Sequence, residues 1–166
     1  WQPPASHFPR IVLEGVLIAI AYGFAEELLF RGWFIDELDR GYSPTTSLWV
    51  SSLIFALLHG IRPQLPALVI MGMMFVWAKR ACRGRLGLAI GLHAGLVGGY
   101  YIVNVGQLVK YSNQVPDWIT GIDKNPLAGM VGILALSAIA LRMRHLAEKQ
   151  SENGGVSSFH RDEQSH

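Results

Sequence analysis

The chain has 166 residues, of which 51% are hydrophobic and 16% are charged, and its formal net charge is +2. Its mean hydropathy is positive, at +0.29, and no nucleic-acid-binding motif is present, so nucleic acid is excluded as a partner. Cys82 is the one cysteine, which excludes an internal disulfide and a cysteine-based metal site.

The apolar residues are gathered in five blocks that approach the length of a membrane-spanning helix. A helix that crosses the hydrocarbon core needs roughly 20 mainly apolar residues. The blocks cover residues 11–31, 44–59, 65–78, 86–108 and 127–141. We therefore predict an all-α, polytopic transmembrane helical bundle with about five spans in this chain. The chain begins with Trp1 and shows no signal-peptide pattern, so we expect it to be a fragment of a larger bundle.

The pattern divides the chain into three regions. Residues 1–9 contain three prolines and two aromatic residues, as expected of an interfacial lead-in to the first span. Residues 10–145 form the predicted transmembrane domain. Residues 146–166 contain too few apolar residues to build a core, so we predict a disordered polar tail.

Lys and Arg are distributed unevenly between the loops. Four of them lie in residues 79–85, Arg40 lies in the first loop, and others follow the last span, whereas the remaining connections carry fewer. Cytoplasmic loops of membrane proteins are enriched in Lys and Arg. We therefore predict that loops 36–45 and 79–85 and the C-terminal tail are cytoplasmic.

The first block contains ionisable residues that an apolar span does not tolerate cheaply. These are Glu26, Glu27 and Arg31. An ionisable side chain near the bilayer centre costs about 2.5–3.5 kcal/mol on insertion scales, so it usually faces a protein interior or a wet cavity. Glu27 and Arg31 are four residues apart on a helix and can form a pair. Glu26 is then left to act as a general base.

Two histidines, His59 and His93, lie inside later spans. Phe55 is one helical turn before His59, so its ring can pack on the imidazole and orient it. One glutamate and two histidines can either ligate zinc, with water in the open position, or activate water directly while a histidine stabilises the oxyanion. The zinc ligands would be Glu26, His59 and His93. Both routes hydrolyse amides, and no HExxH helix is present to favour the metal.

These residues form a pattern that resembles a known family. Glu26-Glu27-Leu-Leu-Phe-Arg31 is similar to an EExxxR motif, Phe55-Ala-Leu-Leu-His59 to an FxxxH motif, and His93 to the first residue of an HxxxN motif. Together, and in this order, they resemble the CPBP intramembrane proteases (Abi family), relatives of the type II CAAX prenyl protease. The resemblance covers roughly residues 11–110.

The resemblance implies a role for each matching residue. Glu26 and His59 would activate the attacking water, Glu27 and Arg31 would support the site, and His93 would help to hold the oxyanion. The sequence departs from the family pattern at Val97, where the family favours an asparagine that can donate a hydrogen bond. Loss of one oxyanion donor typically costs about 10²–10³ in rate. Tyr100, further along the same face, is a hypothetical substitute donor.

The resemblance and the ionisable residues together predict an intramembrane endopeptidase, a membrane hydrolase of the CAAX-box processing class, with metalloprotease character left open. Its predicted partners are the lipid bilayer and a membrane-associated, prenylated CAAX-type protein or peptide, which would enter through a cavity open to the cytoplasm. The main alternative is a catalytically weak scaffold or immunity-type membrane protein on the same fold. A proton-coupled transporter is disfavoured because no inverted repeat of broken helices is present.

Overall fold

The computed structural model describes residues 5–110 and 114–163, and in these ranges every regular element is a helix. The predicted all-α class is therefore confirmed. Residues 1–4 of the predicted lead-in lie outside the described residues, and residues 5–9 are helical. In chain order the elements are a 3-10 turn (Ala5–His7), α1 (Phe8–Glu27), the π-helix η2 (Leu28–Phe34), α2 (Ile35–Gly41), α3 (Pro44–Leu58), α4 (Leu65–Ala81), α5 (Gly87–Val105), α6 (Asp117–Thr120), 3-10 turns η3 (Ile122–Lys124) and η4 (Pro126–Ala128), and α7 (Met130–Glu163).

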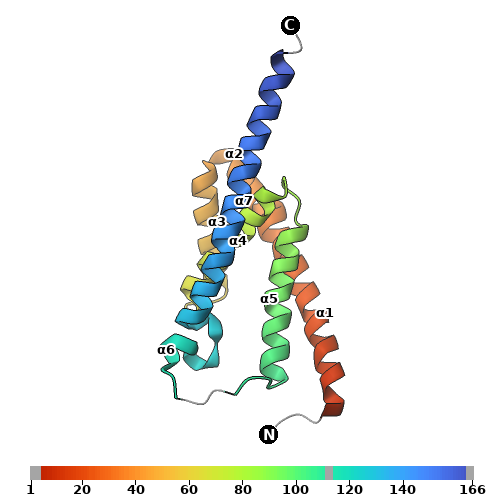
Figure 1. The fold of residues 1–166 in the computed structure, drawn as a ribbon, viewed down its shortest axis with the longest axis vertical. Helices are drawn as coiled ribbons and strands as arrows, with labels where there is room; N and C mark the ends of the chain where they lie inside the picture. Colours follow the sequence, from red (N-terminus) through yellow and green to blue (C-terminus); the bar gives the residue numbers. More distant parts are fainter. Residues whose placement is uncertain (1–4, 111–113, 164–166) are drawn as a thin grey trace.

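Helix α4 lies at the centre of the bundle and contacts α3, α5 and α7, whereas α1 packs along α5 (Figure 1). Phe75, Met74 and Val76 of α4 are completely buried. Small residues bring α1 and α5 close together: a Cβ added at Gly98 would lie 2.9 Å from the Cβ of Ala19. Small residues at a helix interface are what allow backbones to approach closely in lipid.

The continuous path from α1 to α2 passes through the π-helix η2, which starts directly after Glu27 and contains Arg31. The carbonyl oxygen of Arg31 accepts a hydrogen bond of 2.6 Å from Lys79 Nζ, which also pairs with Asp36. Single π-helical turns are frequent at functional sites. Lys79, which the sequence places in a basic loop, instead lies in α4 and is only 8% exposed. A buried cation therefore ties η2 to α4.

Two helices are long and apolar enough to cross a membrane: α5 and residues 130–153 of α7. The five predicted spans are thus supported only in part, because α3 has 15 residues and α4 has 17, close to or below the shortest length for a crossing. Helix α1 has 20 residues, but charged residues lie near both of its ends. Its outer face still exposes large apolar side chains: Leu13, Leu17, Ile20 and Phe24.

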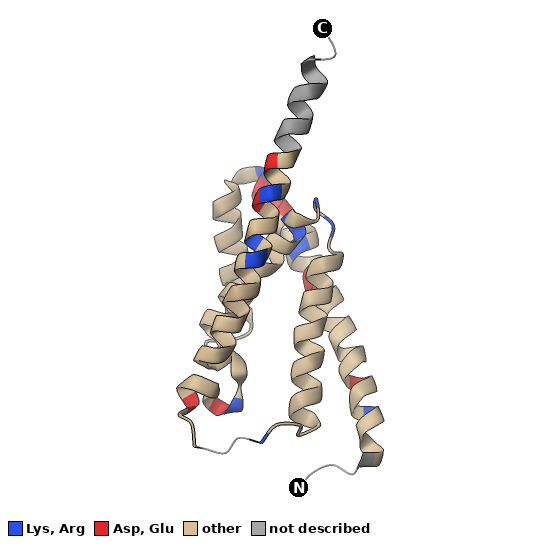
Figure 2. Ribbon diagram, in the orientation of Figure 1, with Lys and Arg blue, Asp and Glu red and all other residues tan. Residues whose placement is uncertain are grey.

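Charged residues gather toward the end of the bundle that holds α2 and the α4–α5 loop, with fewer at the opposite end and a long uncharged stretch between (Figure 2). Arg80 belongs to this charged end. Its guanidinium donates to the carbonyl oxygen of Pro44 and lies 3.6 Å from Asp39. Burial lowers the pKa of Arg80 from its ordinary value, and the nearby Asp39 carboxylate opposes that shift.

The C-terminal segment differs from the predicted disordered tail, because α7 continues as a helix to Glu163. Residues 164–166 lie outside the described part. Residues that favour helix, among them Leu146, Ala147 and Lys149, follow the apolar half of α7. Arg144 and Glu148 form an i,i+4 ion pair of 2.8 Å on its surface, which adds a few tenths of a kcal/mol to a helix.

Candidate functional site

Glu27, Arg31 and His93 form a buried polar cluster where the end of α1 and the start of η2 meet α5. One carboxylate oxygen of Glu27 accepts from Arg31 at 3.0 Å and lies 2.9 Å from His93 Nδ1. Glu27 and Arg31 have no exposed surface, and His93 is 3% exposed. The predicted Glu27–Arg31 pair is therefore present, and it extends to a histidine 66 residues away in sequence.

Arg31 is enclosed by groups that stabilise its charge. Its second terminal nitrogen donates to the carbonyl oxygen of Gly72 in α4 at 3.0 Å. Its guanidinium carbon lies 4.5 Å from the ring centre of Phe55 and 5.0 Å from that of Phe75. Cation–π contacts of this kind are worth up to about 2 kcal/mol when they are desolvated.

Glu26 projects toward both histidines. Its Oε2 atom lies 3.6 Å from His59 Nε2 and 3.8 Å from His93 Nε2. These distances exceed a direct N–H···O hydrogen bond of 2.7–3.2 Å. Oε2 is buried and has no hydrogen-bond partner among the described residues, although the Glu26 side chain as a whole is 22% exposed. The predicted trio of one acid and two imidazoles therefore converges.

The two imidazoles are oriented by contacts through Nδ1. His59 Nδ1 lies 2.8 Å from the carbonyl oxygen of Phe55. Because a carbonyl can only accept, Nδ1 of His59 carries the proton, and the Nε2 atom of the neutral ring is an acceptor. The same reasoning applies to His93 Nδ1, which faces the Glu27 carboxylate. The predicted packing of Phe55 on His59 is present, with the ring centres 4.7 Å apart, and Phe75 stacks on His93 at 4.9 Å.

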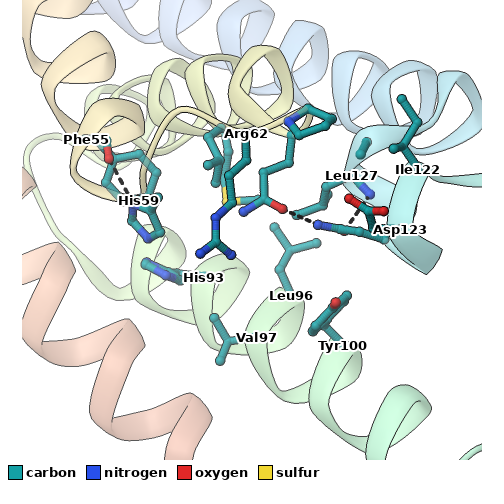
Figure 3. Close-up of a pocket in the computed structure, with 16 residues that line it drawn as sticks. Phe55, His59, Arg62, His93, Leu96, Val97, Tyr100, Ile122, Asp123 and Leu127 are labelled. Atoms are coloured by element: carbon teal, nitrogen blue, oxygen red, sulfur yellow. Dashed lines mark hydrogen bonds between the residues drawn. The ribbon is translucent and has the colours of Figure 1, made fainter. Parts of the chain in front are cut away.

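A cavity of about 420 Å³ opens beside the two histidines (Figure 3). Its walls combine apolar side chains from α4 and α5 with polar residues from the α3–α4 connection and the loop before α7. The lining includes Leu68, Met71, Leu96, Val97, Tyr100, Arg62, Gln64, Asp123 and Asn125. A mostly apolar pocket with a few polar groups is typical of a ligand site.

Part of the cavity lining lies far from the basic loops. Arg62, Gln64, Asp123 and Asn125 come from segments that connect helix ends remote from those loops. Figure 1 places the segment after α6 at the opposite end of the bundle from α2. The basic loops were predicted to be cytoplasmic and the cavity was predicted to open on their side, and both stay predictions.

Sequence reasoning missed several residues of the site. Arg62 lies in the α3–α4 connection, three residues after His59, and lines the cavity. No periodic pattern marks it, because its direction follows from the turn at Gly60. Phe75 and the carbonyl oxygen of Gly72 gave no signal, because a ring in an apolar helix and a backbone carbonyl carry no pattern. Tyr100 lines the cavity but is 45% exposed, so its role as a donor stays a prediction.

The zinc option does not fit the donor arrangement. Within residues 5–110 and 114–163, no group of three or more His, Cys, Asp or Glu side chains is placed to hold a metal ion. Glu26, His59 and His93 are the predicted ligands. Glu26 Oε2 lies 3.6 Å and 3.8 Å from the two Nε2 atoms, which is longer than a direct hydrogen bond.

The Glu26 carboxylate faces two imidazoles that line a cavity. Water-activating hydrolases use this kind of arrangement, and here a bundle of apolar helices carries it. The comparison with protein families also indicates a hydrolase in a membrane. Residues 8–98, more than half of the chain, match the family described as type II CAAX prenyl endopeptidase Rce1-like. The chain therefore belongs to the Rce1-like family, a family of membrane-embedded proteases. No curated protein and no solved structure matches the chain significantly.

Proposed function

We propose that the protein is an intramembrane endopeptidase that hydrolyses a peptide bond of a membrane-associated substrate, with Glu26 as the general base. The observation that supports this most directly is the convergence of the partnerless Glu26 Oε2 on the Nε2 atoms of His59 and His93. Membership of the Rce1-like family supports a peptide substrate and membrane association.

The proposed reaction begins with a water molecule between Glu26 and His59. Both Glu26 Oε2 and the Nε2 atom of neutral His59 are hydrogen-bond acceptors, so the water donates one hydrogen to each and directs its lone pair away from them. Glu26 takes the proton as the oxygen attacks the peptide carbonyl carbon. The same proton then passes to the leaving nitrogen when the C–N bond breaks, which yields a carboxylic acid and an amine.

Glu27 and Arg31 position the reacting groups and do not touch the substrate. Glu27 is held by Arg31 and in turn holds His93 Nδ1. Because Nδ1 of His93 already donates to Glu27, Nε2 of His93 can donate to an oxyanion only when the ring is an imidazolium.

The cavity suits a substrate with an apolar portion. Leu68, Met71 and Leu96 line it together with polar groups, so an apolar chain can lie along one wall while a peptide reaches the histidines. We propose a prenylated CAAX-type peptide as the substrate class, in line with the family description. A metal is not needed for the proton transfers just described.

We also propose that α1, α3 and α4 lie in the bilayer together with α5 and α7. They pack against the two helices that are long enough to cross it, and the outer face of α1 is apolar. Loops 36–45 and 79–85 and the start of the C-terminal segment would be cytoplasmic because they carry most of the basic residues.

The proposed function is tested with the purified protein in proteoliposomes and a fluorogenic peptide that carries a farnesylated CAAX terminus. We expect hydrolysis by the wild type and a loss of about 10²–10⁴ in kcat for Glu26→Gln, the contribution expected of a general base. Mass spectrometry of the products identifies the bond that is cleaved. A scaffold on the same fold would give no hydrolysis above that of empty vesicles. Equal rates for the wild type and Glu26→Gln would also overturn the proposal.

A further inference from the structure

We propose that Arg62 supplies the oxyanion-stabilising charge that Val97 cannot provide, and so is a further catalytic residue of this site. This inference rests on the proposed peptidase function. It begins from a shortage of hydrogen-bond donors around the histidines.

The donors that the site needs are already engaged or absent. A tetrahedral intermediate places negative charge on the former carbonyl oxygen, and preorganised donors must face it. His59 and His93 both use Nδ1 for contacts within the protein, so their neutral rings offer only acceptors at Nε2. Val97 lies one turn after His93 on the cavity wall and has no polar atom. Even with an imidazolium at His93, the oxyanion has one donor fewer than in the family pattern.

Arg62 reaches this place from the opposite wall. Figure 3 shows its guanidinium directed into the cavity, toward His93 and Val97. The chain can turn back sharply after His59 because Gly60 adopts a φ of +88°, which glycine tolerates at no steric cost. A hydrogen bond of 2.9 Å from the amide of Leu65 to the carbonyl oxygen of Arg62 closes the turn.

Arg62 is not paired with any carboxylate in the described part of the chain, although Asp123 lines the same cavity. The structure shows no ion pair or hydrogen bond from its side chain to the residues of 5–110 and 114–163, and the residue is exposed. A guanidinium is always charged and only donates. It is therefore available for an anion that forms during the reaction.

The other polar groups of the cavity are less suitable. Asn125 Nδ2 donates to Gln64 Oε1, and Asn125 Oδ1 accepts from the amide of Leu127, so these amides hold the loop before α7 in place. Tyr100 lies seven residues after His93, which is about 10 Å along the helix axis. Val97 is only about 6 Å from His93 on the same estimate. Arg62 is the donor directed at the Val97 position.

The decisive experiment measures kcat and KM in proteoliposomes for four proteins: the wild type, Arg62→Ala, Val97→Asn and the double variant. We expect Arg62→Ala to lower kcat by about 10²–10³ with little change in KM, as for loss of one oxyanion donor. The double variant should have a kcat at least tenfold higher than that of Arg62→Ala, because Val97→Asn places a donor beside His93. Arg85→Ala, which removes an exposed arginine far from the cavity, is the matched control and should match the wild type.

Two results would overturn the inference while the peptidase function stands. One is an unchanged kcat in Arg62→Ala when Glu26→Gln is inactive. The other is a rise in KM alone that appears for a peptide with a free C-terminal carboxylate and vanishes for its C-terminal amide, which would make Arg62 a substrate-binding residue. If the wild type and Glu26→Gln are equally inactive, the proposed function fails and the inference fails with it.

Discussion

The adjacent glutamates Glu26 and Glu27 have different roles, because a helix directs neighbouring side chains about 100° apart. Glu27 has no exposed surface, and its Oε1 atom is shared by Arg31 and His93. Glu26 is 22% exposed and has no comparable contact, since its Oε2 lies 3.6 Å or more from both imidazoles. A buried charge that loses its partner is costly, and an unpartnered carboxylate beside a cavity is chemically available. Glu27 therefore has a structural role, and its neighbour Glu26 has the reactive one.

These different roles predict different effects on stability for the same substitution at the two positions. Glu27→Gln removes the carboxylate that is paired with the buried guanidinium of Arg31 and should lower the free energy of unfolding by about 3–5 kcal/mol, the usual cost of breaking a buried ion pair. Glu26→Gln is the matched control and should leave stability almost unchanged. Thermal unfolding in one detergent, followed by circular dichroism, measures both. Equal midpoints for Glu27→Gln and the wild type would show that the pair is not structural.

At the scale of the helices, the site depends on how closely α3 and α4 approach. A Cβ added at Gly72 of α4 would lie 2.9 Å from both Cα and Cβ of Ser52 in α3. The carbonyl oxygen of the same glycine receives the hydrogen bond from Arg31. One small residue thus sets both the helix spacing and the position of the arginine.

We expect Gly72→Ala to destabilise the protein by about 1–3 kcal/mol, the range for overpacking a close interface, and to reduce peptidase activity because Arg31 and Glu27 move. Gly91→Ala in α5 is the control, since a Cβ there meets nothing within 4 Å. It should be neutral or slightly stabilising, because alanine favours helix over glycine. Denaturant or thermal titration of both variants checks the difference. A Gly72→Ala protein as stable as Gly91→Ala would contradict the proposed spacing constraint.

The helices and the ionisable cluster were predictable from sequence because their signals are local. Apolar blocks give the helices, and the i,i+4 spacing gives the Glu27–Arg31 and Phe55–His59 contacts. The π-helix was not predictable, because no local pattern marks it; one of its carbonyls, that of Arg31, is bonded by Lys79 from 48 residues away. Arg62 was also missed, since its direction follows from the turn at Gly60 and not from a periodic pattern. The helical start of the predicted disordered tail shows that local helix propensity outweighed low apolar content.

For the whole molecule, the basic residues and the loops that line the cavity lie at opposite ends of the bundle. The basic residues that predict a cytoplasmic face lie around α2 and the α4–α5 loop, whereas the cavity is lined by residues 62–64 and 122–128. The distribution of Lys and Arg is a physical determinant of orientation during insertion. We therefore retain the proposed orientation of the loops, and we expect the cavity to open toward the non-cytoplasmic side or sideways into lipid.

Cysteine accessibility tests this orientation. Cys82 lies in the basic loop after α4, and Ile61, beside Arg62, is 83% exposed. In intact cells, a membrane-impermeant maleimide should label Ile61→Cys in a Cys82→Ser background, because that residue lies beside the cavity on the outer side. The same reagent should label Cys82 of the wild type only after the membrane is permeabilised. Full labelling of both proteins in detergent controls for thiol reactivity. If Cys82 is labelled in intact cells and Ile61→Cys is protected, the loops are reversed and the cavity opens to the cytoplasm.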